Sequence, residues 1–142
     1  QTFYLTNMSA QIHNFNAGIW EVMENQLRDW ITANSSRTDT LFVRKGGTIS
    51  DGNYILGKNN LVVPKYFFSA VLMKNKDGYK AIGFWFDASN TTTSQDLRPY
   101  IVNIQTLQEN TGMDFFCNLP DQTEQQVENL SVDKVKRAWG FK

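Results

Sequence analysis

Four side chains at intervals of four residues mark the part of this sequence in which chemistry could take place: Asn16, Trp20, Glu24 and Arg28. Residues four apart lie on the same side of a helix, so the four would form one row along it. An amide oxygen can bind a hard cation such as Mg²⁺, a carboxylate can hold a metal-bound water, and a guanidinium can contact two phosphate oxygens at once. The row therefore predicts a metal-assisted site for phosphate chemistry, although it contains no general base.

The same row also has a purely structural interpretation. Glu24 and Arg28 can form an ion pair one helical turn apart, worth about 0.2–0.5 kcal/mol, and Asn16 can cap the start of a helix. Trp20 can pack where the helix meets a sheet, or it can stack on a nucleic-acid base. Spacing alone favours the structural interpretation.

Other reactive residue types are scarce. The single histidine, His13, stands in a polar stretch and is expected at the surface. The single cysteine, Cys117, excludes a disulfide or a cysteine-based zinc cage within these 142 residues and is expected to be an inert, buried thiol. Basic residues gather at 44–45 and again at 134–142, where solvated surface is the simpler interpretation.

Hydrophobic periodicity predicts the elements that would position the row. Ile19, Met23, Leu27 and Trp30 repeat at helical spacing, which predicts a helix over about 16–33 with one apolar stripe. Residues 67–74 and 79–86 are rich in strand formers on either side of Asn75-Lys76-Asp77-Gly78, which predicts an antiparallel hairpin. The remaining predictions are strands over 3–8, 40–45 and 100–103, a helix over 104–111 closed by Gly112, a buried segment over 115–117, and helices over 122–129 and 132–138, the last capped by Ser131. The expected fold class is α+β, with helices packed on an antiparallel or mixed sheet.

Composition narrows the class of protein. The chain has 14 basic and 14 acidic residues, and this zero net charge argues against a strongly cationic binder that grips many phosphates, although a locally basic cleft remains compatible with it. No apolar run approaches the roughly 20 residues that span a bilayer, so no membrane span is expected. The length of 142 residues suits one domain, and we expect a single domain over 1–142.

Several stretches resemble one family in order along the chain. They are Phe3-Tyr4-Leu5-Thr6-Asn7-Met8-Ser9-Ala10-Gln11, Asn16-Ala17-Gly18-Ile19-Trp20 with Glu24, Gly46-Gly47, Val63 to Phe68, Ile104 to Gly112 and Phe115 to Pro120. Together they resemble the DNA/RNA non-specific endonucleases, the ββα-metal nucleases that include endonuclease G. The tail Arg-Ala-Trp-Gly-Phe at 137–141 is similar to that of exported bacterial members.

The resemblance implies a role for each matching position. Asn16 would ligate a single divalent ion, Mg²⁺ or another such as Mn²⁺, Glu24 would position water on it, and Arg28 would stabilise the charge of the reacting phosphate. Asn7 and Gln11 would shape the site. The implied activity is hydrolysis of phosphodiester bonds in DNA and RNA, and the implied location is outside the cytoplasm, in the periplasm, at the cell surface or in the medium.

The sequence departs from the family pattern at the general base. The family's histidine belongs to an Asp-Arg-Gly-His motif upstream of the Tyr-Leu-Thr-Asn strand, and Arg-Gly-His occurs nowhere in these residues. Ala10 also replaces the usual proline before Gln11. We therefore expect the C-terminal part of an endonuclease domain, cut from a longer product and nearly inactive alone.

Two further hypotheses follow from the departure. The chain could be a catalytically inactive module, derived from the nuclease fold, that binds nucleic acid or acts as a scaffold. If an upstream strand normally pairs with residues 3–8, its removal exposes a sheet edge, and we expect a companion N-terminal fragment or a homo-oligomer.

Overall fold

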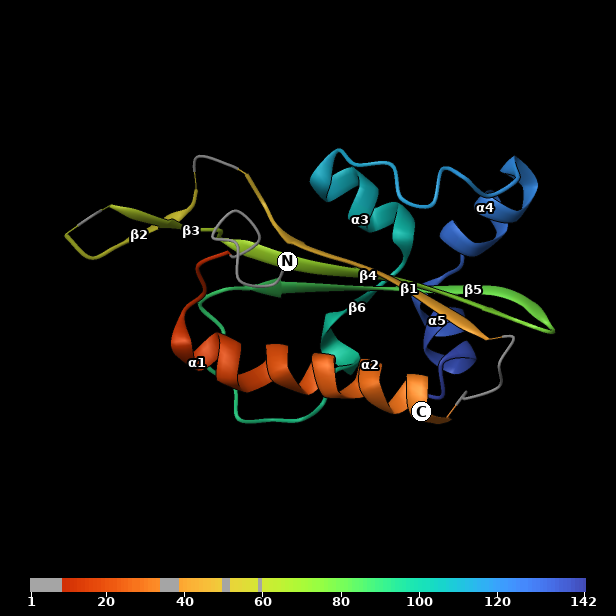
Figure 1. Ribbon diagram of the computed structural model, residues 1–142, viewed down its shortest axis with the longest axis horizontal. Coiled ribbons are helices and arrows are strands. Elements are labelled where there is room, and N and C mark those ends of the chain that lie inside the picture. The colour runs from red at the N-terminus through yellow and green to blue at the C-terminus, as the bar shows by residue number, and fades with distance from the viewer. Residues whose placement is uncertain (1–8, 34–38, 50–51, 59) are drawn as a thin grey trace.

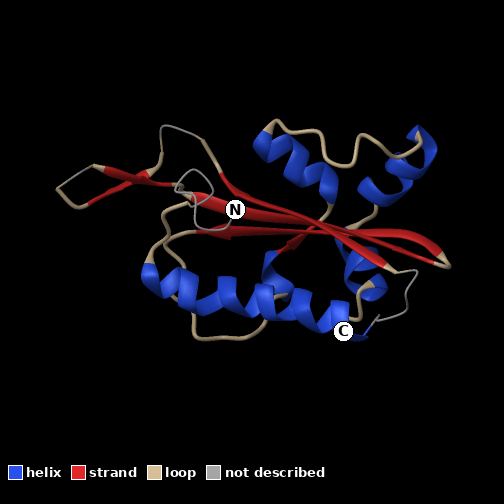
Figure 2. Cartoon of the chain, viewed as in Figure 1, coloured by secondary structure: helices blue, strands red, loops and turns tan. Residues whose placement is uncertain are grey.

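A four-stranded antiparallel sheet forms the centre of the molecule in the computed structural model, which describes residues 9–33, 39–49, 52–58 and 60–142 (Figure 1). The strand order is β1-β4-β5-β6, with β1 over Thr40–Gly47, β4 over Tyr66–Asn75, β5 over Gly78–Asp87 and β6 over Ile101–Val102. Helices cover both faces of the sheet (Figure 2). The predicted α+β fold is confirmed, while the strand predicted over 3–8, with Asn7, lies outside the described residues.

The predicted hairpin forms the two central strands. The ladder between β4 and β5 continues to Asn75 opposite Gly78, so the connecting turn is shorter than the four residues expected. The backbone N–H of Asp77 donates to Asn75 Oδ1 at 2.9 Å, and Gly78 takes a φ of 119°, which a residue with a side chain rarely adopts. Turn chemistry therefore helps to set the register between β4 and β5.

Alternation along β4 divides the interior into two hydrophobic clusters. Phe67, Val71 and Met73 face one side of the sheet, whereas Phe68 and Leu72 face the other, and all are buried. A central strand that is buried on both faces reads as a continuous apolar run, as this one does. The two faces can therefore carry separate sites.

The long N-terminal helix covers the first face. It consists of α1 (His13–Phe15), a π-helical turn η2 (Asn16–Trp20) and α2 (Glu21–Ala33), joined by the C-terminal α5 (Val132–Ala138) on the same face (Figure 1). The predicted apolar stripe is confirmed, since Ile19, Met23, Leu27 and Trp30 are all buried. Trp30 and Trp139 of the C-terminal tail lie with ring centroids 4.4 Å apart.

Two short helices, α3 (Ile104–Thr111) and α4 (Asp121–Glu128), cover the second face. Asn103 caps α3 by accepting from the backbone N–H of Thr106 at 2.9 Å, and Gly112 ends it in the left-handed conformation. Gly83 of β5 lets α3 approach, because a Cβ there would lie 2.8 Å from Leu107 Cδ1. Ser131 occupies the N-cap of α5, but within the described part of the chain its side chain makes no capping hydrogen bond.

Three local predictions need correction. The connection before 64 contains a two-stranded ribbon, β2 (Tyr54–Leu56) paired with β3 (Leu61–Val63), and a 3₁₀ turn, η3 (Arg98–Tyr100), precedes β6. Cys117 is exposed rather than buried. The reason is a tight turn: Phe116 takes a φ of 63°, and its carbonyl accepts from the N–H of Leu119 at 2.9 Å, so only Phe115 of the 115–117 segment is buried.

None of the described helices is both long and apolar enough to cross a bilayer.

Candidate functional site

Asn16 lies at the first position of the π-helical turn. Helix α1 begins three residues earlier, with Ile12 in the N-cap position, and the backbone N–H of Asn16 donates to the carbonyl of Ile12 at 2.9 Å. Asn16 is therefore inside the helix, and the capping interpretation is wrong. Its side chain is exposed and makes no hydrogen bond with any described residue.

The π-helical turn breaks the predicted row. Gly18 leaves the helical conformation, with φ of −113° and ψ of −122°, between Asn16 and the regular helix α2. π-Helical turns of this kind are frequent at functional sites, and here the turn changes the direction of the Asn16 side chain relative to those on α2. Trp20 is 6% exposed and packs against Phe67 and Phe86, which confirms the packing role and excludes base stacking by this side chain.

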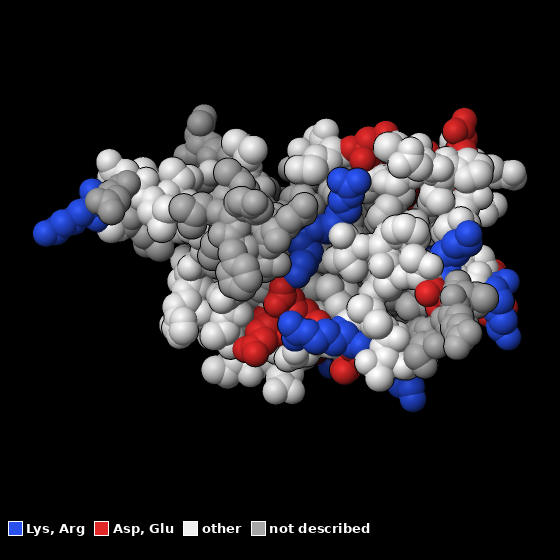
Figure 3. All heavy atoms as spheres, in the orientation of Figure 1, with Lys and Arg blue, Asp and Glu red and all other residues white. Residues whose placement is uncertain are grey.

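Glu24 pairs across to strand β1. Lys45 Nζ donates to Glu24 Oε1 at 2.5 Å, and the two side chains are 39% and 28% exposed. The same ammonium lies 5.8 Å from the centroid of the Trp20 ring. Figure 3 shows acidic and basic atoms beside one another where β1 passes α2. The lysine thus fixes a half-buried carboxylate that faces outward beside the helix.

Arg28 lies one turn further along α2. Its Nη1 donates to Asn25 Oδ1 at 2.6 Å, and its side chain is exposed. The ion pair between Glu24 and Arg28 suggested by their spacing is wrong, because Glu24 is held by a strand residue 21 positions away. A guanidinium held by a neutral amide keeps its full charge for another anion.

The other predicted residues lie near the start of the helix. Gln11 is half-buried just before α1, and His13 is exposed as the first residue of α1, which confirms the expected surface histidine. The structure therefore brings Glu24 together with Lys45 on the α2 face, with Asn16 two turns before it.

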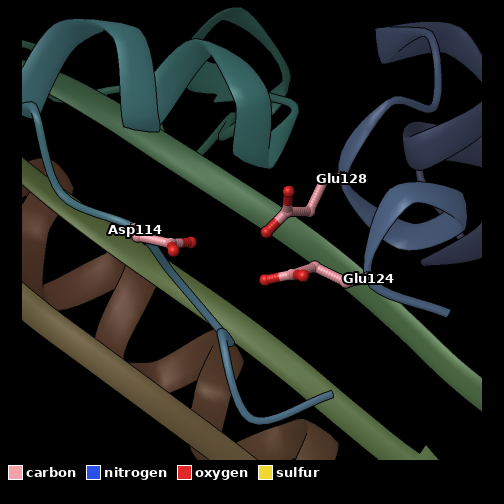
Figure 4. Close-up of side chains that lie close together, drawn as sticks. All are labelled: Asp114, Glu124 and Glu128. Atoms are coloured by element: carbon pink, nitrogen blue, oxygen red, sulfur yellow. The ribbon is translucent and has the colours of Figure 1, made fainter. Parts of the chain in front are cut away.

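Sequence reasoning missed Lys45 and also a second acidic group. Asp114, Glu124 and Glu128 place carboxylate oxygens within 4.8 Å of one another on the α3 and α4 side of the sheet (Figure 4). Burial raises the pKa of Glu128, and the nearby charges of Glu124 and Asp114 raise it further against a hydrogen bond from Gln108. The spacing of Glu124 and Glu128 by one helical turn was a signal in the sequence, but nothing in it placed Asp114 beside them.

The sequence matches a known family over most of its length. A family model described as "DNA/RNA non-specific endonuclease" matches residues 1–122, which include every predicted site residue. The chain belongs to the DNA/RNA non-specific endonuclease family.

Named relatives agree with this membership. The chain is 31% identical over 132 residues to Nuclease C1 of Cunninghamella echinulata var. echinulata, covering 87% of this chain and 52% of that protein. It is 25% identical to a nuclease of Nostoc sp., covering 90% and 47%, and 24% identical to human mitochondrial endonuclease G, covering 83% and 42%. The chain thus spans about half the length of the relatives it matches.

A solved structure shows the same fold. The chain superimposes with a TM-score of 0.71 and 20% identity on a chain of an EndoG/EndoGI complex, covering 92% of this chain and 57% of that one. The sheet with helices on both faces is therefore the fold seen in that structure.

Proposed function

We propose that the protein containing this chain is a Mg²⁺-dependent endonuclease that hydrolyses phosphodiester bonds of both DNA and RNA. The observation that carries the proposal is that an exposed amide, Asn16, precedes a lysine-held carboxylate, Glu24, by two turns in the N-terminal helical segment of a chain in this family. The relatives named as nucleases support the reaction class.

The donor atoms fit a hard divalent ion. Asn16 offers a neutral oxygen that no described residue occupies, and Glu24 offers a carboxylate whose second oxygen, Oε2, lies beside the one that Lys45 holds. Neutral and anionic oxygens are the ligands that Mg²⁺ accepts, usually while it keeps several waters. A bound ion would supply Lewis-acid stabilisation of charge on the scissile phosphate.

Each side chain then has a distinct task. Asn16 would hold the ion, and Glu24 would accept a hydrogen bond from a water near it while Lys45 fixes the carboxylate. Arg28 would donate to phosphate oxygens from its exposed position on α2. Asn7 and Gln11 would shape the site at the start of the helix. The proton from the attacking water would pass to a histidine outside these residues, because Arg-Gly-His is absent from them.

The missing Arg-Gly-His motif also favours a second candidate. A module of this family without its base would bind nucleic acid, or act as a scaffold, without cleaving. The two candidates differ in one readout. The module would bind nucleic acid and retard it in a gel, but it would not nick it at any protein concentration.

Plasmid nicking by the full-length gene product tests the proposal. We expect nicking with Mg²⁺, loss of nicking with EDTA and recovery when Mg²⁺ is restored, and hydrolysis of an RNA of similar length under the same conditions. Asn16→Ala should lower the rate roughly 100-fold or more. The matched control is Asn14→Ala, another exposed asparagine two residues earlier, which should leave the rate within twofold. Nicking unaffected by EDTA or by Asn16→Ala would overturn the proposal.

Assembly and location are further parts of the proposal. We infer self-association or a companion N-terminal fragment, and among the described residues the edge strand β1, with Phe42 49% and Val43 37% exposed, supports the inference. Light scattering on the purified 142-residue chain should give more than the monomer mass, and a single monomeric species would contradict the inference. Export is inferred from the resemblance to exported members, and activity found only in the cytoplasmic fraction would contradict it.

A further inference from the structure

Three carboxylates meet on the face of the sheet opposite the nuclease residues. Glu124 and Glu128 lie one turn apart on α4, and Asp114 comes from the segment that follows α3. One carboxylate oxygen from each lies within 4.8 Å of the other two, and Figure 4 shows all three carboxylates turned toward one shared space. None of the three forms an ion pair with a Lys, Arg or His of the described chain.

Glu128 provides an independent observation. Glu128 is only 8% exposed, and its Oε1 is buried without any hydrogen-bond partner in the described chain. Buried polar atoms without a partner are uncommon in folded proteins, and a buried carboxylate oxygen is among the most costly of them. A positively charged partner would stabilise a buried carboxylate that lies beside two further carboxylates.

Gln108 of α3 fixes the direction of the buried carboxylate. Its Oε1 accepts from the backbone N–H of Phe115 at 2.8 Å, and its Nε2 donates to Glu128 Oε2 at 3.1 Å. One side chain therefore holds the segment that carries Asp114 and also orients Glu128. Oε2 accepts from Gln108, and Oε1 is the oxygen that has no partner among the described residues. Carboxylates that bind a metal ion are usually held in turn by a hydrogen bond from another group.

We propose that Asp114, Glu124 and Glu128 bind a calcium ion. Carboxylate oxygens suit a hard cation, and opposite ligands of Ca²⁺ lie up to about 4.6–5.2 Å apart, a span that accommodates the observed group. Mg²⁺ requires about 4.0–4.2 Å across and a regular octahedron, whereas these ligands come from a helix and an irregular segment. Bound calcium would tie α4 to the segment after α3 and offset the three negative charges.

This site is separate from the proposed nuclease centre. Val127 of α4 belongs to the cluster beneath α3, whereas Met23 and Leu27 of α2 belong to the cluster on the other face of the sheet. The calcium proposal therefore does not depend on Asn16 or Glu24. It predicts a structural ion, whose removal loosens α4 rather than abolishing the chemistry of the other face.

Calorimetric titration of the purified protein with CaCl₂ tests the proposal, and Asn16→Ala serves as background so that the nuclease centre does not contribute. We expect one Ca²⁺ to bind in this background and to raise Tm by roughly 5–15 °C when free Ca²⁺ is about 100 times Kd. Glu128→Gln should weaken binding at least tenfold and remove the Tm response. Glu109→Gln is the matched control, an exposed glutamate on α3 outside the cluster, and should bind as tightly as the background.

The outcomes separate cleanly. Absence of Ca²⁺ binding in the Asn16→Ala background, or unchanged binding in Glu128→Gln, would overturn the site, and tighter binding of Mg²⁺ than of Ca²⁺ would overturn the choice of ion. Should Glu128→Gln fail to fold, Asp114→Asn replaces it, because Asp114 is exposed and its substitution leaves the core intact. Failure of the nuclease proposal would leave all these results unchanged.

Discussion

The two faces of the sheet give a glutamate opposite surroundings: a cationic partner on one face, and none among the described residues on the other. On the α2 face, Glu24 is half-buried and held by Lys45 of β1 at 2.5 Å. On the α4 face, Glu128 is almost fully buried, and one of its oxygens has no partner among the described residues. A carboxylate already neutralised by a lysine suits the positioning of a water or a neighbouring ion. A group of carboxylates without a cation suits direct binding of one.

The elements behind the two groups differ as well. The α2 face has a long helix anchored by a continuous apolar stripe, and its exposed groups project from that rigid support. The α4 face has two helices of eight residues each and an irregular segment between them. We infer that the first face presents its side chains from one continuous helical support, whereas the second brings its carboxylates together from separate segments.

The largest expected effect concerns the nuclease residues that we propose on the α2 face. Glu24→Ala should lower the rate of plasmid nicking by the full-length protein roughly 100-fold, because a residue that orients metal-bound water typically affects activity on that scale. Glu21→Ala removes an exposed carboxylate from the first turn of α2 and should leave the rate within twofold. A loss of less than threefold for Glu24→Ala would remove this residue from the site.

A smaller effect should follow loss of the lysine. Lys45→Met should lower the nicking rate roughly tenfold, because Glu24 would lose the group that orients it. The test for positioning is the double variant: in a Glu24→Ala background, Lys45→Met should cause no further loss. Arg44→Met, one residue earlier on β1, is the control for general loss of positive charge. Equal losses in the presence and absence of Glu24 would show that Lys45 acts on the nucleic acid itself.

Most of the fold could be predicted from the sequence because short-range patterns determine it. The stripe Ile19, Met23, Leu27 and Trp30 fixed the helix and its buried side, and the turn before Gly78 fixed the central hairpin. The ribbon of β2 and β3 was missed because each strand has only three residues, too few for a period to be recognised. Cys117 was placed wrongly because a single left-handed residue, Phe116, reverses the chain before it.

The candidate site was predictable only in part. Asn16, Glu24 and Arg28 could be singled out by type and spacing, but spacing assumed a regular helix, and the π-helical turn at Gly18 changed their alignment. The partner of Glu24 lies 21 residues away on β1, and the group around Glu128 joins two segments ten or more residues apart. Contacts of that range depend on sheet register and helix packing, which no local pattern contains.

Stability measurements should distinguish the two glutamates by sign. In EDTA, Glu24→Gln should lower the free energy of unfolding by about 0.2–1 kcal/mol, the usual value of a partly exposed ion pair. Glu128→Gln should instead raise it by about 1 kcal/mol, because the amide removes a buried charge and can donate to the neighbouring carboxylates. Urea denaturation of both variants provides the measurement, and changes of the same sign would contradict the contrast drawn between the two faces.

The smallest effect concerns a carboxylate that is exposed and firmly paired. Hydrogen bonds from the Arg98 side chain and backbone lower the pKa of Asp96 to about 2, with both oxygens accepting from the guanidinium at 2.8 Å. Because the folded pKa is lowered, this pairing contributes stability above the unfolded pKa and loses it as pH falls toward 2. Carboxyl NMR titration should give a rising midpoint from the unsubstituted protein through Arg98→Lys to Arg98→Gln. An unchanged midpoint would show that the arginine does not govern this carboxylate, and would weaken the contrast between Glu24, which has a cationic partner, and Glu128, which has only the amide of Gln108.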